Sequence, residues 1–489
     1  FLKYADFSHY AESFNDMEDE NIVQAIPNAK ASEWMEENIP LFECPQRNFE
    51  EMYYYRWWSL RKHIKETPVG YGMTAFLVQR SYSDKYNLIA CAIGHHIYES
   101  RWLRDPKYLD QIIHTWYRGN DGGPMKKMDK FSSWNADAVL ARYMGDGDKD
   151  YLLDMKKDLE TEYQRWERTN RLKNGLYWQG DVQVGMEESI SGGRRKKYAR
   201  PTINSYMYGN AKALSCIGIL SGDEGMAMKY GMRADTLKNL VENELWNTRH
   251  QFFETMRTDS SANVREAIGY IPWYFNLPDT TQKYEIAWKE IMDEKGFSAP
   301  YGLTTAERRH PEFRTRGVGK CEWDGAIWPF ASAQTLTAMA NFMNNYPQTV
   351  LSDSVYFRQM ELYVESQYHR GRPYIGEYLD EVTGYWLKGD QERSRYYNHS
   401  TFNDLMITGL IGLRPRLDDT IEINPLIPAD KWDWFCLDNV LYHGHNLTII
   451  WDKNGDRYHC GKGLRIFVNG KEAGHTDTLT RLVCENALK

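Results

Sequence analysis

The alternation of two kinds of helix constrains the fold of this chain most. From Asp150 to Arg171, apolar side chains recur every three or four residues among charged ones, which predicts an amphipathic helix with one solvent-exposed face. The segment 204–220 carries small and apolar residues on all sides, which predicts a helix buried among others. The same two kinds of helix are predicted downstream. The segments 223–246 and 281–295 are predicted to be amphipathic helices, and 328–343 is predicted to be a buried one. An inner and an outer layer of helices would satisfy this pattern.

The character of the sequence changes after about residue 415. Apolar and polar residues then alternate, and the pairs Asn454-Gly455 and Asn469-Gly470 are strong hairpin signals. We therefore predict a mainly α protein with a helical domain over residues 1–414 and a small antiparallel β module over 415–489 that covers it.

Composition excludes some partners and favours another. Lys and Arg total 60 against 68 for Asp and Glu, and the only basic cluster is short, which argues against nucleic acid. No run of about 18 apolar residues is present, which argues against a membrane span. The chain holds 17 Trp and 34 Tyr, more than a core of this size needs. Aromatic rings pack on the apolar faces of sugars, so we expect an oligosaccharide or polysaccharide substrate.

The cysteines and the first residues say little about cofactor or compartment. Seven cysteines are spread singly, so we expect no disulfide framework, no metal site and no cofactor. The first residues show no basic segment followed by an apolar one. A periplasmic or extracellular protein whose signal peptide has been removed is expected, and a cytoplasmic one stays open. The sequence does not indicate an oligomeric state.

Two loops rich in Gly, Trp and Tyr carry carboxylates just before buried helices. The loop 175–193 holds Glu187 and Glu188, and the loop 372–386 holds Glu377. Cleavage of a glycosidic bond needs one carboxylic acid to protonate the departing oxygen and a second group on the other side of the sugar. Two loops from opposite halves of a helical ring can supply that pair. From the residues alone, a loop cap or a surface charge is the competing interpretation of each carboxylate.

Three short motifs resemble glycoside hydrolase family 63 and its relatives similar to mannosylglycerate hydrolase. The run Gly185–Ser189 (GMEES) resembles their G-M-D-N-S-P element, whose Asp is the general acid. The run Gly376–Gly384 (GEYLDEVTG) resembles their Y-E-N-Y-N-P-x-T-G element, whose Glu is the general base. The run Trp323–Pro329 (WDGAIWP) is similar to their W-R-G-P-I-W stretch, which walls the sugar site. Order and spacing agree over roughly residues 50 to 415.

The resemblance implies an (α/α)6 toroid that hydrolyses glycosides with inversion, with Glu187 as acid and Glu377 as base. We expect exo action and carboxyl groups about 6.5–9.5 Å apart, because a water must fit between them. Glu187 should be protonated at rest, its pKa raised by burial and by Glu188, and Glu377 ionised. The chain departs from the family pattern because Glu replaces Asp at the acid position, which leaves Glu188 as an alternative acid. Asp324 stands where many relatives have Arg.

Other side chains near these motifs are predicted to hold the sugar. They are Trp178, Asp181, Glu188, Arg200, Trp323, Asp324, Trp328, Tyr378 and His399.

Three other functions compete with hydrolysis. A disaccharide phosphorylase on the same toroid would depend on phosphate, and the presence of Glu377 argues against it. A glycan-binding protein without chemistry would bind but release no sugar. A polysaccharide lyase would need a Tyr or His base and would make an unsaturated product. The sequence does not name the sugar, the anomer or the linkage.

Overall fold

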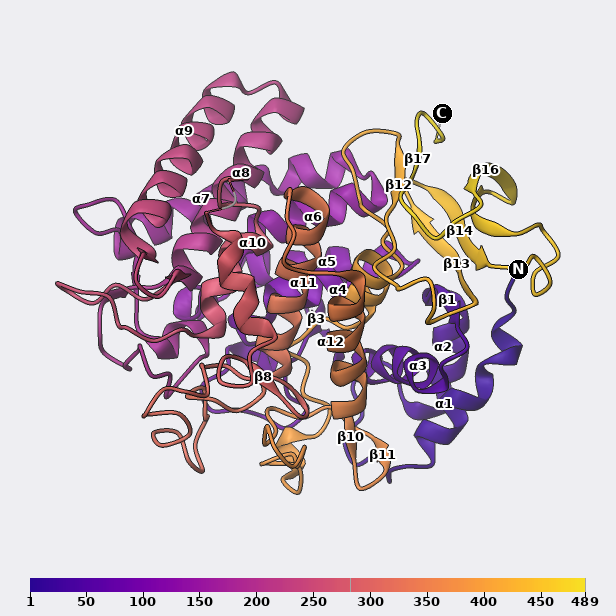
Figure 1. Cartoon of the computed structure of the whole chain (residues 1–489), viewed down its shortest axis with the longest axis horizontal. Helices are drawn as coiled ribbons and strands as arrows, with labels where there is room; N and C mark the ends of the chain where they lie inside the picture. The colour runs from indigo at the N-terminus through magenta and orange to yellow at the C-terminus, as the bar shows by residue number, and fades with distance from the viewer. Residues whose placement is uncertain (282, 489) are drawn as a thin grey trace.

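The protein is mainly helical, with a small antiparallel sheet at one end (Figure 1). A computed structural model describes residues 1–281 and 283–488. Its α-helices are α1 (Ser8–Asn15), α2 (Ala31–Asn38), α3 (Arg47–Lys62), α4 (Ile93–Ser100), α5 (Pro106–Arg118), α6 (Asn135–Asp146), α7 (Lys149–Asn170), α8 (Pro201–Ser221), α9 (Glu224–Leu240), α10 (Ile271–Tyr274), α11 (Pro329–Asn345) and α12 (Asp353–Ser366).

Local signals in the sequence set the ends of these helices. Asp148 and Asp223 cap α7 and α9, and their side chains accept hydrogen bonds of 3.0 Å from Tyr151 N and Met226 N. α8 begins with proline at its first position, where the missing N–H costs nothing. It ends at Gly222, whose φ of +73° is a left-handed conformation that favours glycine.

The long helices contact one another in sequence order. α8 packs against α6, α7, α9 and α10. α10 contacts α11, α11 contacts α12, and α12 returns to α3 near the start of the chain. α8 and α11 are buried over most of their length, and α7 buries one stripe that includes Leu152, Leu159 and Trp166. The core therefore lies between an inner and an outer set of helices.

The helix predictions are confirmed for α7, α8 and α11, whose observed ends lie within a few residues of those expected. The predicted helix 223–246 ends earlier, because α9 gives way to a wider turn over Val241–Leu245. The α-helix predicted over 281–295 is wrong for the residues that the structure describes. Gln282 lies outside those residues. A 3-10 helix over Glu285–Ile291 stands there instead.

The antiparallel sheet has the order β1-β13-β14-β15-β16. Its strands are β1 (Leu41–Glu43), β13 (Trp434–Tyr442), β14 (His445–Asp452), β15 (Gly463–Val468) and β16 (Lys471–Thr476). The hairpin at Asn469-Gly470 joins β15 to β16, and both turn residues have positive φ, as its turn type requires. Asn454-Gly455 lies in a longer connection between β14 and β15. The β module is confirmed, but β1 comes from the N-terminal part of the chain, and Figure 1 shows the sheet beside α1 to α3.

Short two-stranded sheets shape the loops between the helices. They are β2–β3 (Ile64–Thr67, Gly70–Met73), β4–β5 (Trp178–Gln179, Tyr198–Ala199), β6–β7 (Trp246–Asn247, Phe252–Phe253), β8–β9 (Ser298–Ala299, Gly302–Leu303), β10–β11 (Tyr368–His369, Arg372–Pro373) and β12–β17 (Ile421–Ile423, Leu482–Cys484).

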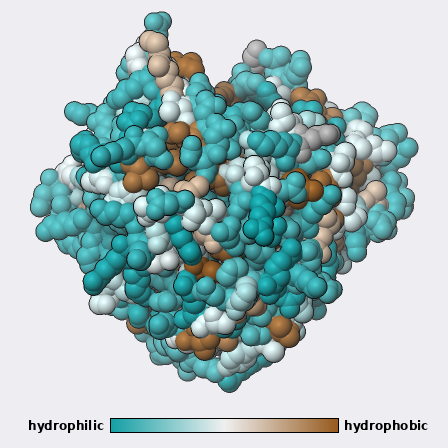
Figure 2. Space-filling view, turned by 60° about the vertical axis from the view of Figure 1, so that its left-hand side comes forward, coloured by the Kyte–Doolittle hydropathy of each residue, from teal (hydrophilic) through white to brown (hydrophobic). Residues whose placement is uncertain are grey.

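The surface is mostly polar. The face in Figure 2 is largely hydrophilic, with small apolar patches scattered over it. Among the described residues, every helix is too short or too polar to cross a lipid bilayer.

Candidate active site

The loop that carries Glu187 is held between the paired strands β4 and β5. Its backbone turns back on itself, since Met186 N donates to Asp181 O at 3.0 Å and Gly185 adopts a left-handed φ of +72°. Glu188 also has a positive φ, of +70°, which is uncommon for a residue other than glycine. Its side chain turns to Arg194, at 3.2 Å. The local backbone therefore separates two adjacent glutamates, with Glu188 in an ion pair and Glu187 half-buried.

A buried arginine supports this loop from beneath. Arg200 is fully buried, and both terminal nitrogens of its guanidinium lie 3.3 Å from Ser189 Oγ. Burial lowers the pKa of Arg200, and the charges of Glu266 and Asp181 offset part of that lowering. A side chain at Gly192 would collide with Ser189 and Arg200, so only glycine fits there. The buried guanidinium of Arg200 thus packs against the loop that carries Glu187.

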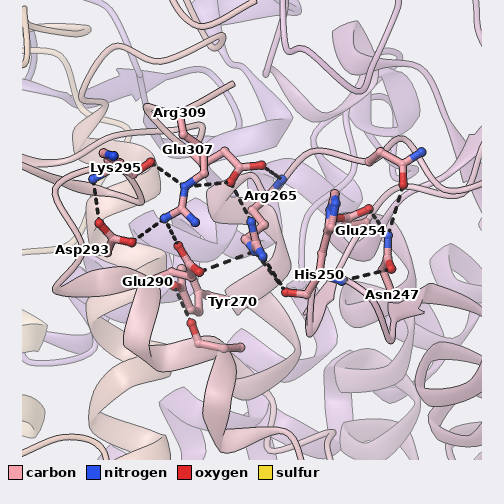
Figure 3. A network of polar contacts seen from close by, with 12 residues as sticks. Asn247, His250, Glu254, Arg265, Tyr270, Glu290, Asp293, Lys295, Glu307 and Arg309 are labelled. Atoms are coloured by element: carbon pink, nitrogen blue, oxygen red, sulfur yellow. Dashed lines mark hydrogen bonds and ion pairs between the residues drawn. The ribbon is translucent and has the colours of Figure 1, made fainter. Parts of the chain in front are cut away.

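Glu266 joins this support from another part of the chain. It is buried, and it accepts hydrogen bonds from Ser191 N, at 3.2 Å, and from the Ser191 hydroxyl. Its neighbour Arg265 lies in the polar network of Figure 3, where its guanidinium contacts Glu307 at 2.8 Å and the carbonyl oxygen of His250 at 2.8 Å. That network links the segments around residues 250, 265 and 307. It therefore fixes the backbone from which Glu266 reaches the acid loop.

The environment of Glu187 favours its protonated form. Loss of hydration raises the pKa of Glu187 to about 7, and the neighbouring charges of Asp181 and Glu188 add to the increase. Arg194 and a backbone N–H oppose it. A carboxyl group with this pKa carries a proton for a large part of the time near neutral pH, as a general acid must.

Glu377 lies beyond the β10–β11 hairpin in a rigid loop. Its backbone N–H donates to Ser394 Oγ at 3.2 Å, and only 4% of the residue is exposed. Leu379, two residues on, exchanges two backbone hydrogen bonds of 3.0 Å with Ile327. Burial raises the pKa of Glu377, while Arg393, Lys388 and Arg80 oppose the shift in that order. Arg393 lies 2.9 Å from Oε1 of the carboxylate.

The two carboxylates act on the same neighbours. The pKa of the Cys321 thiol is raised to about 12, first by burial and then by the negative charges of Glu187 and Glu377. The pKa of Tyr397 is raised by burial and by the same two charges. Because the charges of both glutamates act on each of these groups, the acid loop and the base loop lie near the same two side chains, Cys321 and Tyr397.

Stacked aromatic rings lie beside Tyr397. The ring centroids of Trp323 and Trp328 lie 4.7 Å apart, and those of Trp328 and Tyr378 lie 4.8 Å apart, both pairs nearly parallel. His399 stacks on Tyr397 at 4.1 Å. All five rings are buried. The indole N–H groups of Trp323 and Trp328 have no hydrogen-bond partner among the described residues, so each could donate to a sugar hydroxyl.

The remaining predicted residues lie in different surroundings. Asp324 is fully buried, and its Oδ2 accepts the backbone N–H groups of Arg316, at 2.6 Å, and Gly317, at 2.9 Å. Arg200 and Asp324 are fully buried and support the loops, and their contact with a sugar stays a prediction. Trp178 lies at the foot of the acid loop, with the Lys197 ammonium 4.5 Å from its ring centre.

Sequence reasoning missed several residues at this site. Arg80, Cys321, Lys388 and Arg393 surround the carboxylates, and Glu266 holds the acid loop. None of them belongs to a motif or a periodic pattern, so only the folded chain brings them together.

A cavity of about 470 Å³ lies behind the base loop. Tyr374, Gln391 and Arg395 are among the residues that line it, and neither Glu187 nor Glu377 does. The segment 389–396 therefore has two sides, one that carries Arg393 to Glu377 and one that faces this cavity.

A buried and a half-buried carboxylate on two loops beside stacked aromatic rings suit the chemistry of a glycosidase. Residues 85–400 match the family model described as the mannosylglycerate hydrolase MGH1-like glycoside hydrolase domain, and the chain belongs to this family. Residues 413–475 match the C-terminal domain of glycosyl hydrolase family 65. The resemblance seen in the three motifs is thus confirmed.

Several solved structures share the fold of this chain. One titled "Sialidase" is 96% identical to this chain over its full length, with a TM-score of 0.99, and this chain spans 45% of that longer one. A family 78 rhamnosidase of Bacillus sp. GL1 has 12% identity and a TM-score of 0.59, over 88% of this chain and 41% of its own. A family 63 mannosylglycerate hydrolase from Thermus thermophilus, in complex with glucose, has 13% identity and a TM-score of 0.53, over 73% of this chain and 99% of its own. The last two likenesses concern the fold alone.

Proposed function

We propose that this chain hydrolyses a glycosidic bond by inversion from the end of a glycan, with Glu187 as general acid and Glu377 as general base. One observation carries the proposal: the charges of both glutamates act on Cys321 and on Tyr397. The carboxyl groups of an inverting pair stand about 6.5–9.5 Å apart, which leaves room for a water. The ring of contacts from α6 through α8, α10, α11 and α12 to α3 supports an (α/α)6 toroid around the site.

The reaction follows from the two protonation states. Glu187 gives its proton to the glycosidic oxygen as the bond to the anomeric carbon breaks. Glu377 takes a proton from a water that attacks the same carbon from the opposite face, so the product has the inverted configuration. Glu187 is left ionised and Glu377 protonated, and exchange with solvent restores both. Arg393 holds Oε1 of Glu377, so Oε2 remains for the water.

A contact between two loops supports the proposal of action at a chain end. Arg316 Nη1 donates to Ile190 O at 2.7 Å and to Ser189 O at 3.3 Å, which ties the 314–325 loop to the acid loop. We propose that this tie closes one side of the site to a polymer that would pass through it.

Sialosides are the first substrates to test, because the longer chain that contains a nearly identical segment is titled a sialidase. We propose a sialic acid glycoside as one candidate substrate for this chain. Sialidases that use a Tyr nucleophile are exceptions to the two-carboxylate scheme. Retention at the anomeric carbon would point to such chemistry.

The test combines a substrate panel with two variants. Sialosides, rhamnosides, mannosides and glucosides are incubated with the protein, and the anomer first released is followed by NMR. We expect release of the inverted anomer from one class, and loss of that release in Glu187→Gln and in Glu377→Gln. Release that continues unchanged in both variants, or a retained anomer, would refute the proposal. Cleavage only in the presence of phosphate would identify a phosphorylase instead.

A further inference from the structure

The cavity behind the base loop is lined by neither of the two glutamates assigned to hydrolysis. It holds about 470 Å³, which lies within the range of about 300–1,000 Å³ that small-molecule sites occupy. Its walls come from the β10–β11 hairpin, which lies at the lower edge of Figure 1, from the segment 389–396 and from Met17 after α1. A ligand in this cavity would therefore occupy a second site.

Two buried tyrosines anchor the walls of the cavity. The ring of Tyr374 packs against His369, at 5.1 Å between ring centres, and against the edge of Trp386, at 5.3 Å. Its hydroxyl donates to Gly389 O at 3.3 Å, which joins the hairpin to the segment 389–396. The hydroxyl of Tyr396 donates to Glu18 Oε2 at 2.7 Å. The walls are therefore held in place by the protein itself, as in most small-molecule sites.

The polar side chains on the walls have unused hydrogen-bonding capacity. Arg372 and Glu392 are exposed, and among the described residues their side chains form no hydrogen bond and no ion pair. Arg395 approaches Glu18 only to 3.9 Å, and its guanidinium donates no hydrogen bond within the described part of the chain. Guanidinium and carboxylate groups each offer at least two hydrogen-bonding atoms in one plane. Neighbouring hydroxyls on a sugar ring match such a pair.

The charges on the walls nearly cancel. The charged residues that line the cavity are Arg370, Arg372, Arg395, Asp390 and Glu392. Arg370 forms an ion pair with Asp390 at 2.8 Å, and Glu18 lies beside Arg395. A surface with balanced charge gives no strong preference for an anion or a cation. A neutral ligand with many hydroxyls suits these walls best.

The cavity offers little to an apolar ligand. Met17 and Pro373 are the only aliphatic side chains among the described residues that line it. The remaining apolar surface comes from the rings of His369, Tyr374 and Tyr396. Ring faces with polar groups around them fit a sugar, whose C–H faces are apolar and whose edge carries hydroxyls. A lipid chain would leave those polar groups without partners.

One contact joins the cavity to the base loop. Gln391 lines the cavity, and its Oε1 accepts a hydrogen bond from Arg393 Nε at 3.0 Å. Arg393 in turn pairs with Glu377 at 2.9 Å. The side chains of Gln391 and Arg393 thus separate the cavity from the base. A ligand in the cavity would lie beside the base loop without touching Glu377.

We propose that this cavity binds a neutral saccharide, as a second carbohydrate site beside the one in which hydrolysis is proposed. Tyr374 and His369 would present ring surface to the sugar, and Arg372, Glu392 and Arg395 would bind its hydroxyls. Binding here needs neither of the two catalytic glutamates. The inference therefore goes beyond the proposed hydrolysis and fails or stands separately from it.

The test locates binding along the chain. Lactose, maltose and mannobiose are the probes, and hydrogen–deuterium exchange is followed by mass spectrometry. Peptides that cover 369–374 and 389–396 report the cavity, and peptides that cover 185–193 and 323–328 report the site of cleavage. Calorimetric titration gives the affinities, with galacturonate and inorganic phosphate as charged comparisons. All measurements are repeated on Glu187→Gln, so that cleavage of a probe does not imitate binding.

Single variants then separate the cavity from the rest of the surface. Arg372→Met and Arg395→Met keep the length of the stem and remove the planar donors. Arg249→Met is the matched control, because Arg249 is exposed between β6 and β7, lies outside the cavity and forms no ion pair among the described residues. Gln391 is left unchanged, because its amide also holds Arg393. Circular dichroism and thermal melting show whether each variant folds.

We expect at least one disaccharide to slow exchange in 369–374 and 389–396, with the same affinity in the wild type and in Glu187→Gln. Arg372→Met and Arg395→Met should each weaken this binding by about 10- to 100-fold, as the loss of a hydrogen bond from a charged group predicts. Arg249→Met should bind as the wild type does.

Three results would overturn the inference. The first is exchange that none of the disaccharides slows in 369–374 and 389–396, including the case in which only 185–193 and 323–328 are protected. The second is tighter binding of galacturonate or phosphate than of every disaccharide, which would make the cavity an anion site. The third is unchanged binding in both Arg372→Met and Arg395→Met. None of these results bears on hydrolysis, which Glu187→Gln and Glu377→Gln test on their own.

Discussion

The site predicts how hydrolysis depends on pH. The departing oxygen needs a proton from Glu187, so the activity must fall as the pH rises through the pKa of that group, which is about 7. The profile of kcat/KM reports the free protein, and its alkaline limb should therefore lie near neutral pH. A glutamate with its ordinary pKa of 4.5 would place the limb well below pH 6.

The size of the effect follows from that pKa. The protonated fraction of Glu187 should fall from roughly nine-tenths at pH 6 to roughly one-tenth at pH 8, so kcat/KM should drop by about tenfold. Removal of the Arg194 charge should move the limb upward, because Arg194 lowers the pKa of Glu187. Glu188→Gln should move it downward, because the charge of Glu188 raises that pKa.

The assay uses two leaving groups on the same sugar. Glu187→Gln should lose roughly 10²- to 10⁴-fold on a substrate whose leaving group is a sugar, and its alkaline limb should disappear. It should lose much less on an aryl glycoside, since a nitrophenolate departs without a proton. Glu188→Gln is the matched control and should keep its activity. An alkaline limb that survives in Glu187→Gln, or a larger loss in Glu188→Gln, would refute the assignment of the acid.

Three further predictions concern the base, the support of the acid loop and the buried histidines. Glu377→Gln should lose activity by roughly 10²- to 10⁴-fold on both leaving groups, because the water still needs a base; a loss confined to the sugar leaving group would contradict its role. Glu266→Ala should lower the free energy of unfolding in urea by about 3–5 kcal/mol, because it strips a buried charge from beside Arg200. Glu266→Gln, which keeps a partner for Ser191, should recover part of that loss, and an equal effect of both variants would argue against the charge. His63 and His96 have pKa values lowered to about 3 and about 4 by burial, so they stay neutral in the folded protein. These two histidines take up protons in the unfolded chain below about pH 6.5, so their contribution to stability should be constant above that pH and fall by about 2 kcal/mol per histidine by pH 5. A His63→Gln/His96→Gln double variant that loses as much stability as the wild type between pH 7 and pH 5 would contradict this.

Local periodicity predicted the parts of the fold that depend on neighbours in the sequence. α7 follows from apolar spacing, and α8 and α11 follow from small and apolar residues on all sides, as helices buried among others require. The same reasoning gave a wrong α-helix around Trp288. Its buried residues Tyr284, Ala287 and Ile291 are three or four apart, and this spacing suits a short 3-10 turn as well as an α-helix.

The candidate site was predictable only in part, for a different reason. The motifs around Glu187 and Glu377 are continuous in sequence, so a resemblance could select them. Arg80 comes from a distant segment and acts on Glu377 only in the folded chain, and no local pattern in the sequence predicts that approach. Arg200 lies near the acid motif in sequence, and only its full burial distinguishes a support from a ligand contact.

The pairing of β1 with β13 has a practical consequence for anyone who divides this protein. Leu41–Glu43 pair with Cys436–Asp438 and form one edge strand of the sheet. A fragment that starts after residue 414 would leave those backbone groups of β13 without their partners. An unpaired edge strand can form hydrogen bonds with another chain. Such a fragment should self-associate, while one that retains residues 41–43 in cis, or receives them as a peptide, should remain dispersed.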